Sequence, residues 1–480
     1  MLAKTATNQS IAMNYSTNQT RLLAAGWVFT GTGQALRHGG VLFQGDKILD
    51  VLPESAWRRL LESEKLSHEY LQRAILSPGL FNLHTHLDYT DASSIYIQWK
   101  SMDPGRPQNL FAWLKDLVSL ARTWKPEDFQ TSARHGAKEL ALAGVIHCAD
   151  SSYTGEAARA LAATGLKGLV GLELFGLDPE RAEANFQGWL KRFAALEADP
   201  LILKANQESR RVTLTVAPHA PYTVAPDLWQ LARNFAASRN LTVLAHLAES
   251  KQECAWLKAS AALAPTLNEE TLSLASELDA YLKWITPPGS RPDLLQTLPF
   301  KDAGRSPTAH LAAHALLDEN LLAAHLVEMS PQDIDCFAKS GARAALCPRS
   351  NLTLGNNAAA AEALEKAGVP FALGTDSRAS SPDLCPRAEA TFFNNRRQRP
   401  LEARHLHRLI TLEAARVLAV DKHTGSLTKG KQADLAIFET TEDPADEEAS
   451  YKQFFAESTR LKNLFVDGRQ VVSDGELVFA

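Results

Sequence analysis

Eight short apolar segments alternate with longer stretches through the middle of this 480-residue chain. The short segments have the length of buried strands, and several of the stretches between them repeat apolar residues at helical spacing. Strand–helix alternation repeated eight times predicts an α/β fold, a parallel (β/α)8 barrel of the TIM type. The expected strands span residues 74–83, 144–149, 168–174, 212–217, 241–246, 321–325, 342–347 and 369–374, and the clearest helices span 126–143, 155–164, 226–239, 331–340 and 359–367.

Both ends of the chain read as short strands joined by turns, with one helix expected over residues 54–70. Neither end alone has enough strands for a stable sheet, so residues 21–76 and 421–480 are predicted to form one small β-sandwich domain together. Residues 77–420 would then be the barrel. The first 20 residues, rich in Asn, Thr and Ser, are expected to be a disordered tail without a secretory signal, and Met13 is an alternative start.

Two histidines close the first expected barrel strand. His84 and His86 are two residues apart, so on a strand they would point to the same face. His246, His325 and Asp376 each stand at the end of another expected strand. In a closed barrel those ends converge on one rim, whereas an open doubly wound sheet gives no reason for this placement. Imidazole and carboxylate ligands of this kind suit Zn²⁺ or Fe²⁺, so the pattern predicts a metal-dependent hydrolase.

Composition excludes several other classes. The net charge is −5 and no strongly basic block occurs, which argues against nucleic acid or an anionic membrane as a partner. No apolar run reaches the roughly 20 residues that span a bilayer. The five cysteines are scattered without a C-x-x-C pair, as in a cytoplasmic protein with reduced thiols. A small-molecule substrate is therefore the expected partner.

Several longer motifs carry a family resemblance. They are Pro-Gly-Leu-Phe-Asn at 78–82 before the paired histidines, Pro-His-Ala-Pro-Tyr-Thr-Val at 218–224, His-Leu-Ala-Glu-Ser at 246–250, Cys-Pro-Arg-Ser-Asn at 347–351 and Gly-Lys-Gln-Ala-Asp-Leu at 430–435. With these motifs the chain resembles the amidohydrolase superfamily, specifically its branch of mononuclear metal-dependent deaminases and chlorohydrolases. That branch includes cytosine, guanine, adenosylhomocysteine and aminodeoxyfutalosine deaminases and triazine hydrolases.

The resemblance implies a role for each strand-end residue. One divalent ion, Zn²⁺ with Fe²⁺ as the alternative, would be bound by His84, His86, His246 and Asp376. Glu249 would carry protons and His325 would polarise the attacking water or the developing oxyanion, with Asp376 as the third catalytic residue. A second ion held by a carboxylated lysine is not expected, because Lys204 is the only lysine near the fourth strand and precedes it.

A wider set of residues is expected to contact substrate: His219, Asp88, Glu173, Arg349, Ser350 and Asn351. Three of these assignments, those of Asp88, Arg349 and Glu173, stay open. Asp88 is one methylene shorter than the glutamate that aminodeoxyfutalosine-type deaminases show at this place, which weakens transfer of that substrate. Arg349 could equally pair with a structural carboxylate, and Glu173 and Asp150 could be structural.

The leading functional hypothesis is hydrolytic deamination of an aromatic amidine carbon in an adenine-like base or nucleoside derivative. The alternatives are a chlorohydrolase or triazine-type hydrolase, or a cyclic-amide hydrolase, on the same scaffold. An inactive binding homologue is disfavoured because every expected ligand position is filled. By analogy with the family a homodimer is expected, and residues 286–307, rich in Pro and Gly, are a candidate lid.

Overall fold

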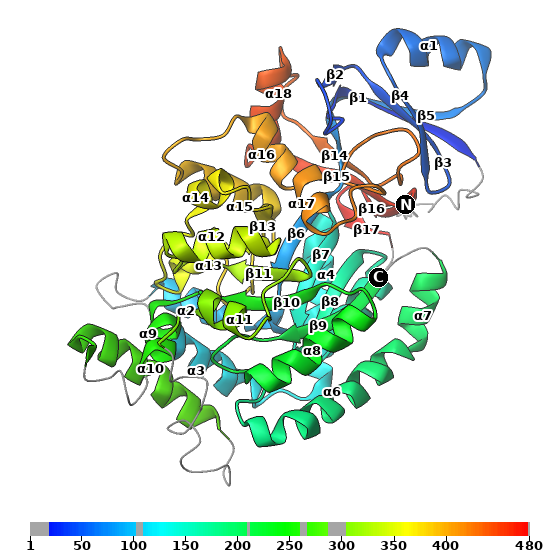
Figure 1. The fold of residues 1–480 in the computed structure, drawn as a ribbon. Helices are drawn as coiled ribbons and strands as arrows, with labels where there is room; N and C mark the ends of the chain where they lie inside the picture. The colour runs from blue at the N-terminus through cyan, green and yellow to red at the C-terminus, as the bar shows by residue number, and fades with distance from the viewer. Residues whose placement is uncertain (1–18, 102–108, 209–211, 260–265, 287–303, 479–480) are drawn as a thin grey trace, which may run out of the picture.

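The barrel is built from two parallel four-stranded sheets that close into one ring (Figure 1). The computed structural model describes residues 19–101, 109–208, 212–259, 266–286 and 304–478. Strand β9 lies beside β10, where the His246 amide donates to the His219 carbonyl, and β13 lies beside β6. The predicted (β/α)8 fold is confirmed, with strands β6 (Leu80–Thr85), β7 (Val145–Ser152), β8 (Lys167–Leu174), β9 (Val212–Pro218), β10 (Val243–Leu247), β11 (Leu321–His325), β12 (Arg343–Leu346) and β13 (Phe371–Leu373).

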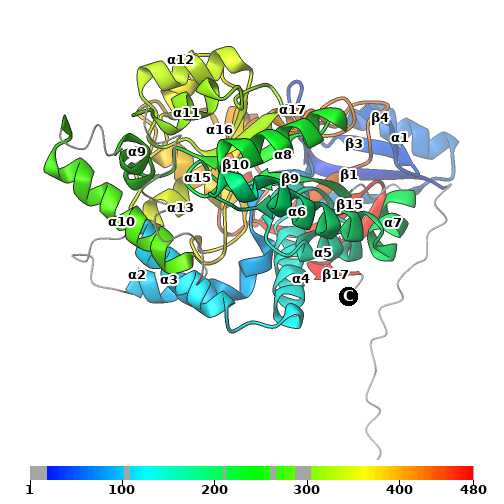
Figure 2. The same ribbon diagram turned by 60° about the horizontal axis from the view of Figure 1, so that its bottom comes forward.

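Most helices of the barrel domain pack around the outside of this ring, and short ones follow the carboxyl ends of its strands (Figures 1 and 2). The helix predicted over 331–340 has those bounds in the structure, and the others differ by one or two residues at their ends. They are α4 (Pro126–Leu142), α5 (Glu156–Thr164), α6 (Ala182–Glu197), α7 (Pro200–Gln207), α8 (Pro226–Ser238), α11 (Pro307–Ala313), α12 (Pro331–Ser340), α13 (Pro348–Thr353), α14 (Ala361–Lys366), α15 (Pro386–Asn395), α16 (Ala403–Leu409) and α17 (Leu412–Val417), with a short 3-10 turn η2 at Pro179–Arg181.

The two chain ends share one nine-stranded sheet, as predicted for the small β domain (Figure 1). The antiparallel pairing of β5 with β14 joins them, and Phe43 and Phe465 meet in the core with ring centroids 6.1 Å apart. The strands are β1 (Thr20–Val28), β2 (Leu36–Arg37), β3 (Gly40–Gln44), β4 (Lys47–Leu52), β5 (Ser67–Pro78), β14 (Leu435–Glu439), β15 (Arg460–Val466), β16 (Arg469–Ser473) and β17 (Glu476–Leu477), accompanied by helices α1 (Glu54–Ser63) and α18 (Glu447–Phe454).

Three predicted boundaries were wrong. Residues 74–83 are not one strand, because the chain turns at Gly79 from β5 into β6; a Cβ at Gly79 would lie 2.2 Å from the Ile146 side chain. The helix expected to reach residue 70 ends at Ser63, and β5 takes over from Ser67. Thr20, expected in the tail, already belongs to β1, whereas residues 1–18 lie outside the described part of the chain.

Four helices form a cap over the carboxyl ends of the barrel strands, on the side away from the β domain (Figures 1 and 2). They share a second apolar core with loop residues that follow β9, β12 and β13, among them Tyr222 and Ala379. The cap consists of α2 (Ser93–Ser101), α3 (Leu110–Ala121), α9 (Lys251–Lys258) and α10 (Glu269–Ile285), and the 3-10 turn η1 (Leu87–Ala92) leads into it. Most of the lid candidate 286–307 lies outside the described residues. Within the described ranges, no helix is long and apolar enough to cross a membrane.

Candidate metal centre and active site

Three imidazoles meet at the carboxyl end of the barrel. His84 is the last residue but one of β6 and His86 directly follows the strand; their ring centroids are 4.8 Å apart and their planes nearly perpendicular. His246 of β10 lies 4.9 Å from His84 and stacks almost parallel to His86 at 5.2 Å. The Nε2 atoms of His86 and His246 are 3.1 Å apart. The strand ends that the sequence placed at one rim thus bring three metal-ligand nitrogens together.

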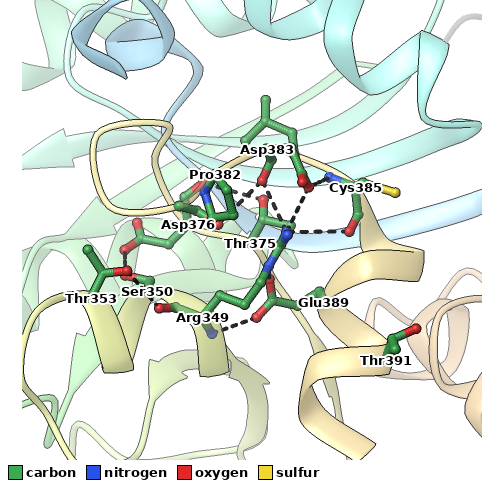
Figure 3. A network of polar contacts seen from close by, with 12 residues as sticks. Arg349, Ser350, Thr353, Thr375, Asp376, Pro382, Asp383, Cys385, Glu389 and Thr391 are labelled. Carbon is green, nitrogen blue, oxygen red and sulfur yellow. Dashed lines mark hydrogen bonds and ion pairs between the residues drawn. The ribbon is translucent and has the colours of Figure 1, made fainter. Parts of the chain in front are cut away.

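Asp376 completes the cluster from the end of β13, the strand beside β6. Its Oδ1 lies 3.6 Å from His84 Nε2 and 3.5 Å from His86 Nε2. Its Oδ2 accepts a hydrogen bond from the Ser350 hydroxyl (Figure 3) and another from the Ser380 hydroxyl. One oxygen is thus fixed, and the other faces the imidazoles. Gly374 makes this approach possible, because a Cβ there would lie 2.6 Å from the backbone nitrogen of His84.

The four side chains fit a divalent ion. His246 Nδ1 donates to the His219 carbonyl at 2.9 Å, which leaves the lone pair of Nε2 facing the cluster. His84 Nε2 is buried and has no hydrogen-bond partner among the described residues. Burial and neighbouring imidazoles hold the pKa of both histidines well below the ordinary value, so both are neutral, which is the ligand form. Three nitrogens and a carboxylate oxygen suit zinc or ferrous iron.

Glu249 and His325 stand together beside the metal ligands. Glu249 Oε1 lies 3.8 Å from His325 Nε2, and both side chains are buried. Burial raises the pKa of Glu249, which favours a carboxyl that can hold a proton. His325 Nδ1 donates to Asn351 Oδ1 at 2.9 Å, so its Nε2 points toward Glu249. A buried carboxyl with a raised pKa and an imidazole thus lie together beside the histidine cluster.

The backbone of Glu249 is held by a residue that sequence reasoning missed. The amide of Glu249 donates to Glu253 Oε2 at 2.8 Å, and Glu253 is fully buried. Ser250 begins α9 as its N-cap and accepts from the Glu253 amide at 3.2 Å. The S-x-x-E pattern at 250–253 is a capping-box signal that could have identified this glutamate. Ser380 carried no comparable signal.

The expected substrate-binding residues fall into two groups. His219 and Glu173 face the ion site: a His219 ring nitrogen, a Glu173 oxygen and a His246 ring nitrogen all lie within 4.8 Å of one another. Burial, with His86 and His325 nearby, lowers the pKa of His219 to about 3. The second group comprises Asp88, Arg349, Ser350 and Asn351, whose polar groups are largely engaged by the protein.

Internal hydrogen bonds account for most of that second group. Asp88 Oδ2 accepts from Ser152 and from the amide and hydroxyl of Thr154 at 2.7–2.9 Å. Arg349 forms ion pairs with Glu389 and with Asp383, the latter at 2.9 Å, as in the structural alternative raised for it (Figure 3). The corresponding contacts of Ser350 and Asn351 hold Asp376 and His325. In the structure these two side chains therefore contact Asp376 and His325.

A model described as the amidohydrolase family matches residues 75–471. The chain belongs to the amidohydrolase family. A 5-methylthioadenosine/S-adenosylhomocysteine deaminase of Symbiobacterium thermophilum is 24% identical over 431 residues, covering 87% of this chain and 85% of the relative. Among solved structures, an aminofutalosine deaminase of Helicobacter pylori matches with a TM-score of 0.74 at 20% identity, covering 95% of this chain and 100% of that chain. An atrazine chlorohydrolase of Arthrobacter aurescens, solved with zinc, gives 0.70 at 18% identity, covering 96% and 97%.

These likenesses confirm several predictions for this amidohydrolase. The enzyme class is a hydrolase acting on carbon–nitrogen bonds, as expected from the sequence. The fold of the solved relatives agrees with the barrel and its small β domain. The zinc in the Arthrobacter structure agrees with the predicted divalent cofactor, for which the four-residue cluster has the right donor atoms.

Proposed function

We propose that this amidohydrolase is a deaminase of a purine-type base or nucleoside derivative. Water would replace the exocyclic amino group on the amidine-like ring carbon, leaving a ring carbonyl and releasing ammonia. The observation that carries the proposal is the buried Glu249 carboxyl beside His325 and the ion site. An amine leaves only after gaining a proton, and Glu249 is placed to supply it. The deaminase names of the relatives support this reading.

The reaction divides among the clustered residues. His84, His86, His246 and Asp376 would hold the ion, which lowers the pKa of water and supplies a nucleophile near neutral pH when bound. Asp376 accepts a proton from the attacking water. A protonated Glu249 then donates to the ring nitrogen, takes up the second proton of the attacking water, and passes it to the departing amine; the proton on Asp376 afterwards restores Glu249.

His325 stabilises the developing negative charge. Because its Nδ1 donates to Asn351, its Nε2 can donate a second hydrogen bond only in the cationic form. The Glu249 carboxyl lies 3.8 Å from that nitrogen. His219 lines the same space, with its Nδ1 paired to the Thr223 hydroxyl at 2.9 Å and Nε2 left for substrate.

The test is ammonia release by zinc-loaded protein from adenine-, guanine- and cytosine-type compounds. Glu249→Gln should lower kcat about 10²- to 10⁴-fold, since it removes a general acid–base group. The metal content of this variant should stay at one ion per chain, because Glu249 is not among the proposed ligands. Ammonia release that is unaffected by Glu249→Gln would contradict the mechanism.

The second candidate is hydrolytic release of chloride from a triazine-type ring, favoured by the structural match to the Arthrobacter enzyme. Chloride leaves without a proton, so this activity would depend far less on Glu249. Chloride release from atrazine, measured with the same two proteins, separates the two reactions.

The remaining expectations belong to the same proposal. We infer a cytoplasmic enzyme that acts on a small molecule, assembles as a homodimer, and is divided into a barrel over 77–420 and a β domain from 21–76 and 421–480. Sedimentation of the purified chain would test the dimer.

A further inference from the structure

Glu173 carries a buried carboxyl for which the described residues offer no hydrogen-bond or ion-pair partner. It lies near the end of β8 and is 4% exposed. Within the described part of the chain, no hydrogen bond or ion pair engages its oxygens, although buried carboxyls are normally satisfied. One oxygen lies within 4.8 Å of ring nitrogens of His219 and His246. The unpaired group therefore faces the space where the reaction would take place.

Two further carboxyls lie behind Glu173. Asp150 accepts from the Thr85 hydroxyl at 2.7 Å and the Leu87 amide at 2.8 Å through Oδ2, and its Oδ1 has no partner among the described residues. Asp88 is bonded in the same one-sided way. Burial, followed by the charges of these two aspartates, raises the pKa of Glu173 well above its ordinary value. The surroundings thus favour a carboxyl that retains its proton and can donate it in a hydrogen bond.

The ion site does not require Glu173. His84, His86, His246 and Asp376 already provide four ligands of suitable chemistry, and Glu249 and His325 come from different strand ends. An uncharged aromatic ring bound between the ion site and Glu173 would present to Glu173 an edge other than the one that carries the reacting carbon. In an adenine ring substituted at N9, as in adenosine, the exocyclic amine is the only N–H donor, and the remaining ring edges present the acceptor nitrogens N1, N3 and N7.

We propose that Glu173 selects the substrate ring by donating a hydrogen bond to an acceptor nitrogen on the edge that faces β8. The inference rests on the proposed purine deamination and adds a specificity residue to it. Because Glu249 is assigned the ring nitrogen next to the reacting carbon, the nitrogen read by Glu173 would be N3 or N7 of the purine. A site built for such a bond rejects analogues that lack the acceptor.

The test compares adenosine with 3-deazaadenosine and 7-deazaadenosine, in which one ring nitrogen is replaced by C–H. Ammonia release gives kcat and KM, and calorimetry gives affinity without requiring turnover. In the wild-type protein one of the two analogues should be at least tenfold poorer than adenosine. In Glu173→Leu that difference should disappear, whereas Glu173→Gln, whose amide still donates, should retain part of it.

Controls separate this role from others. Glu183→Gln, on the exposed face of α6, should behave as wild type. Zinc content should remain one ion per chain in both Glu173 variants; loss of the ion would make Glu173 a ligand and overturn the inference. Equal losses for all three compounds in Glu173→Leu, or no binding of any of them to the wild type, would also overturn it. Binding with the expected discrimination but no ammonia release would contradict only the proposed reaction.

Discussion

Replacing Lys167 by Met should destabilise the protein more than any surface charge substitution. Lys167 begins β8 at the amino end of the barrel and is buried. Its ammonium donates to both oxygens of Asp434 at 2.8 and 2.9 Å, to Asp467 at 2.7 Å and to Gln432 at 3.0 Å. All these acceptors belong to the carboxy-terminal part of the chain, so one side chain ties the barrel to the β domain.

The expected cost follows from the two carboxylates left behind. The side chains of Asp434 and Asp467 are 2% and 3% exposed, and without Lys167 they would repel each other in a site with little water. Removing one partner of a buried charge pair costs about 3–5 kcal/mol. For a chain of this length that unfolds as one unit, the unfolding entropy is about 1 kcal/mol per degree, so the melting temperature should fall by about 3–5 °C.

The assay is urea unfolding at pH 8, followed by tryptophan fluorescence, alongside thermal melts. Lys339→Met is the matched control, because Lys339 pairs with Asp335 at 2.6 Å but its side chain is 75% exposed. Because solvent screens that exposed pair, its loss should leave the stability nearly unchanged. Adding Asp467→Asn to Lys167→Met should recover part of the loss by removing one of the two charges. A Lys167→Met variant as stable as Lys339→Met would refute the reasoning.

Two further changes test other parts of the fold. Gly374→Ala should lower the zinc content, and overpacking should lower its stability by about 1–3 kcal/mol, because its Cβ would lie 2.6 Å from His84. Gly188→Ala is the control: it is a helical site with nothing within 4 Å, so stability should rise by about 0.5–1 kcal/mol in the same unfolding assay. Loss of zinc in Gly188→Ala would contradict the argument. His407 has its pKa lowered by burial to about 3, so the unfolded chain gains a proton below pH 6.5 that the folded chain does not. The free energy of unfolding of the wild type should therefore decrease with falling pH below 6.5 more steeply than that of His407→Gln, by about 1.4 kcal/mol for each pH unit. Parallel pH profiles of the two proteins would show that His407 does not stay neutral.

The sequence predicted that His84, His86, His246 and Asp376 would meet, because their meeting depends on backbone geometry. Alternation along a strand puts His84 and His86 on one face, and barrel closure brings the ends of β10 and β13 to the same rim, so residue order alone predicted the meeting. The bonding of Arg349 was different. Its partner Glu389 is 40 residues away on another helix, and no periodicity distinguishes a side chain that meets substrate from one that meets a carboxylate.

The lysines show the same limit more sharply. Lys204, the lysine considered from the sequence, is an exposed residue of α7, whereas the burial of Lys167 was not predicted. The acceptors of Lys167 stand 265 to 300 positions later in the chain. A lysine at the start of a strand is ordinarily at the surface, and only the docking of the β domain against the barrel makes this one interior.

Three residues at the rim of the barrel adopt a backbone conformation that their side chains disfavour. Ala248, His325 and Asp376 have φ of 52°, 76° and 63°, a conformation that favours glycine, yet none of them is glycine. Such positions cost about 1–2 kcal/mol each and persist only when surrounding contacts fix them. Here the contacts are visible: the Asp376 amide donates to the His84 carbonyl at 2.8 Å, and the amides of residues 327 and 328 donate to the Ala248 carbonyl. The turns that aim Glu249, His325 and Asp376 inward are therefore held by the barrel, which is why their direction follows from strand closure and not from the local sequence.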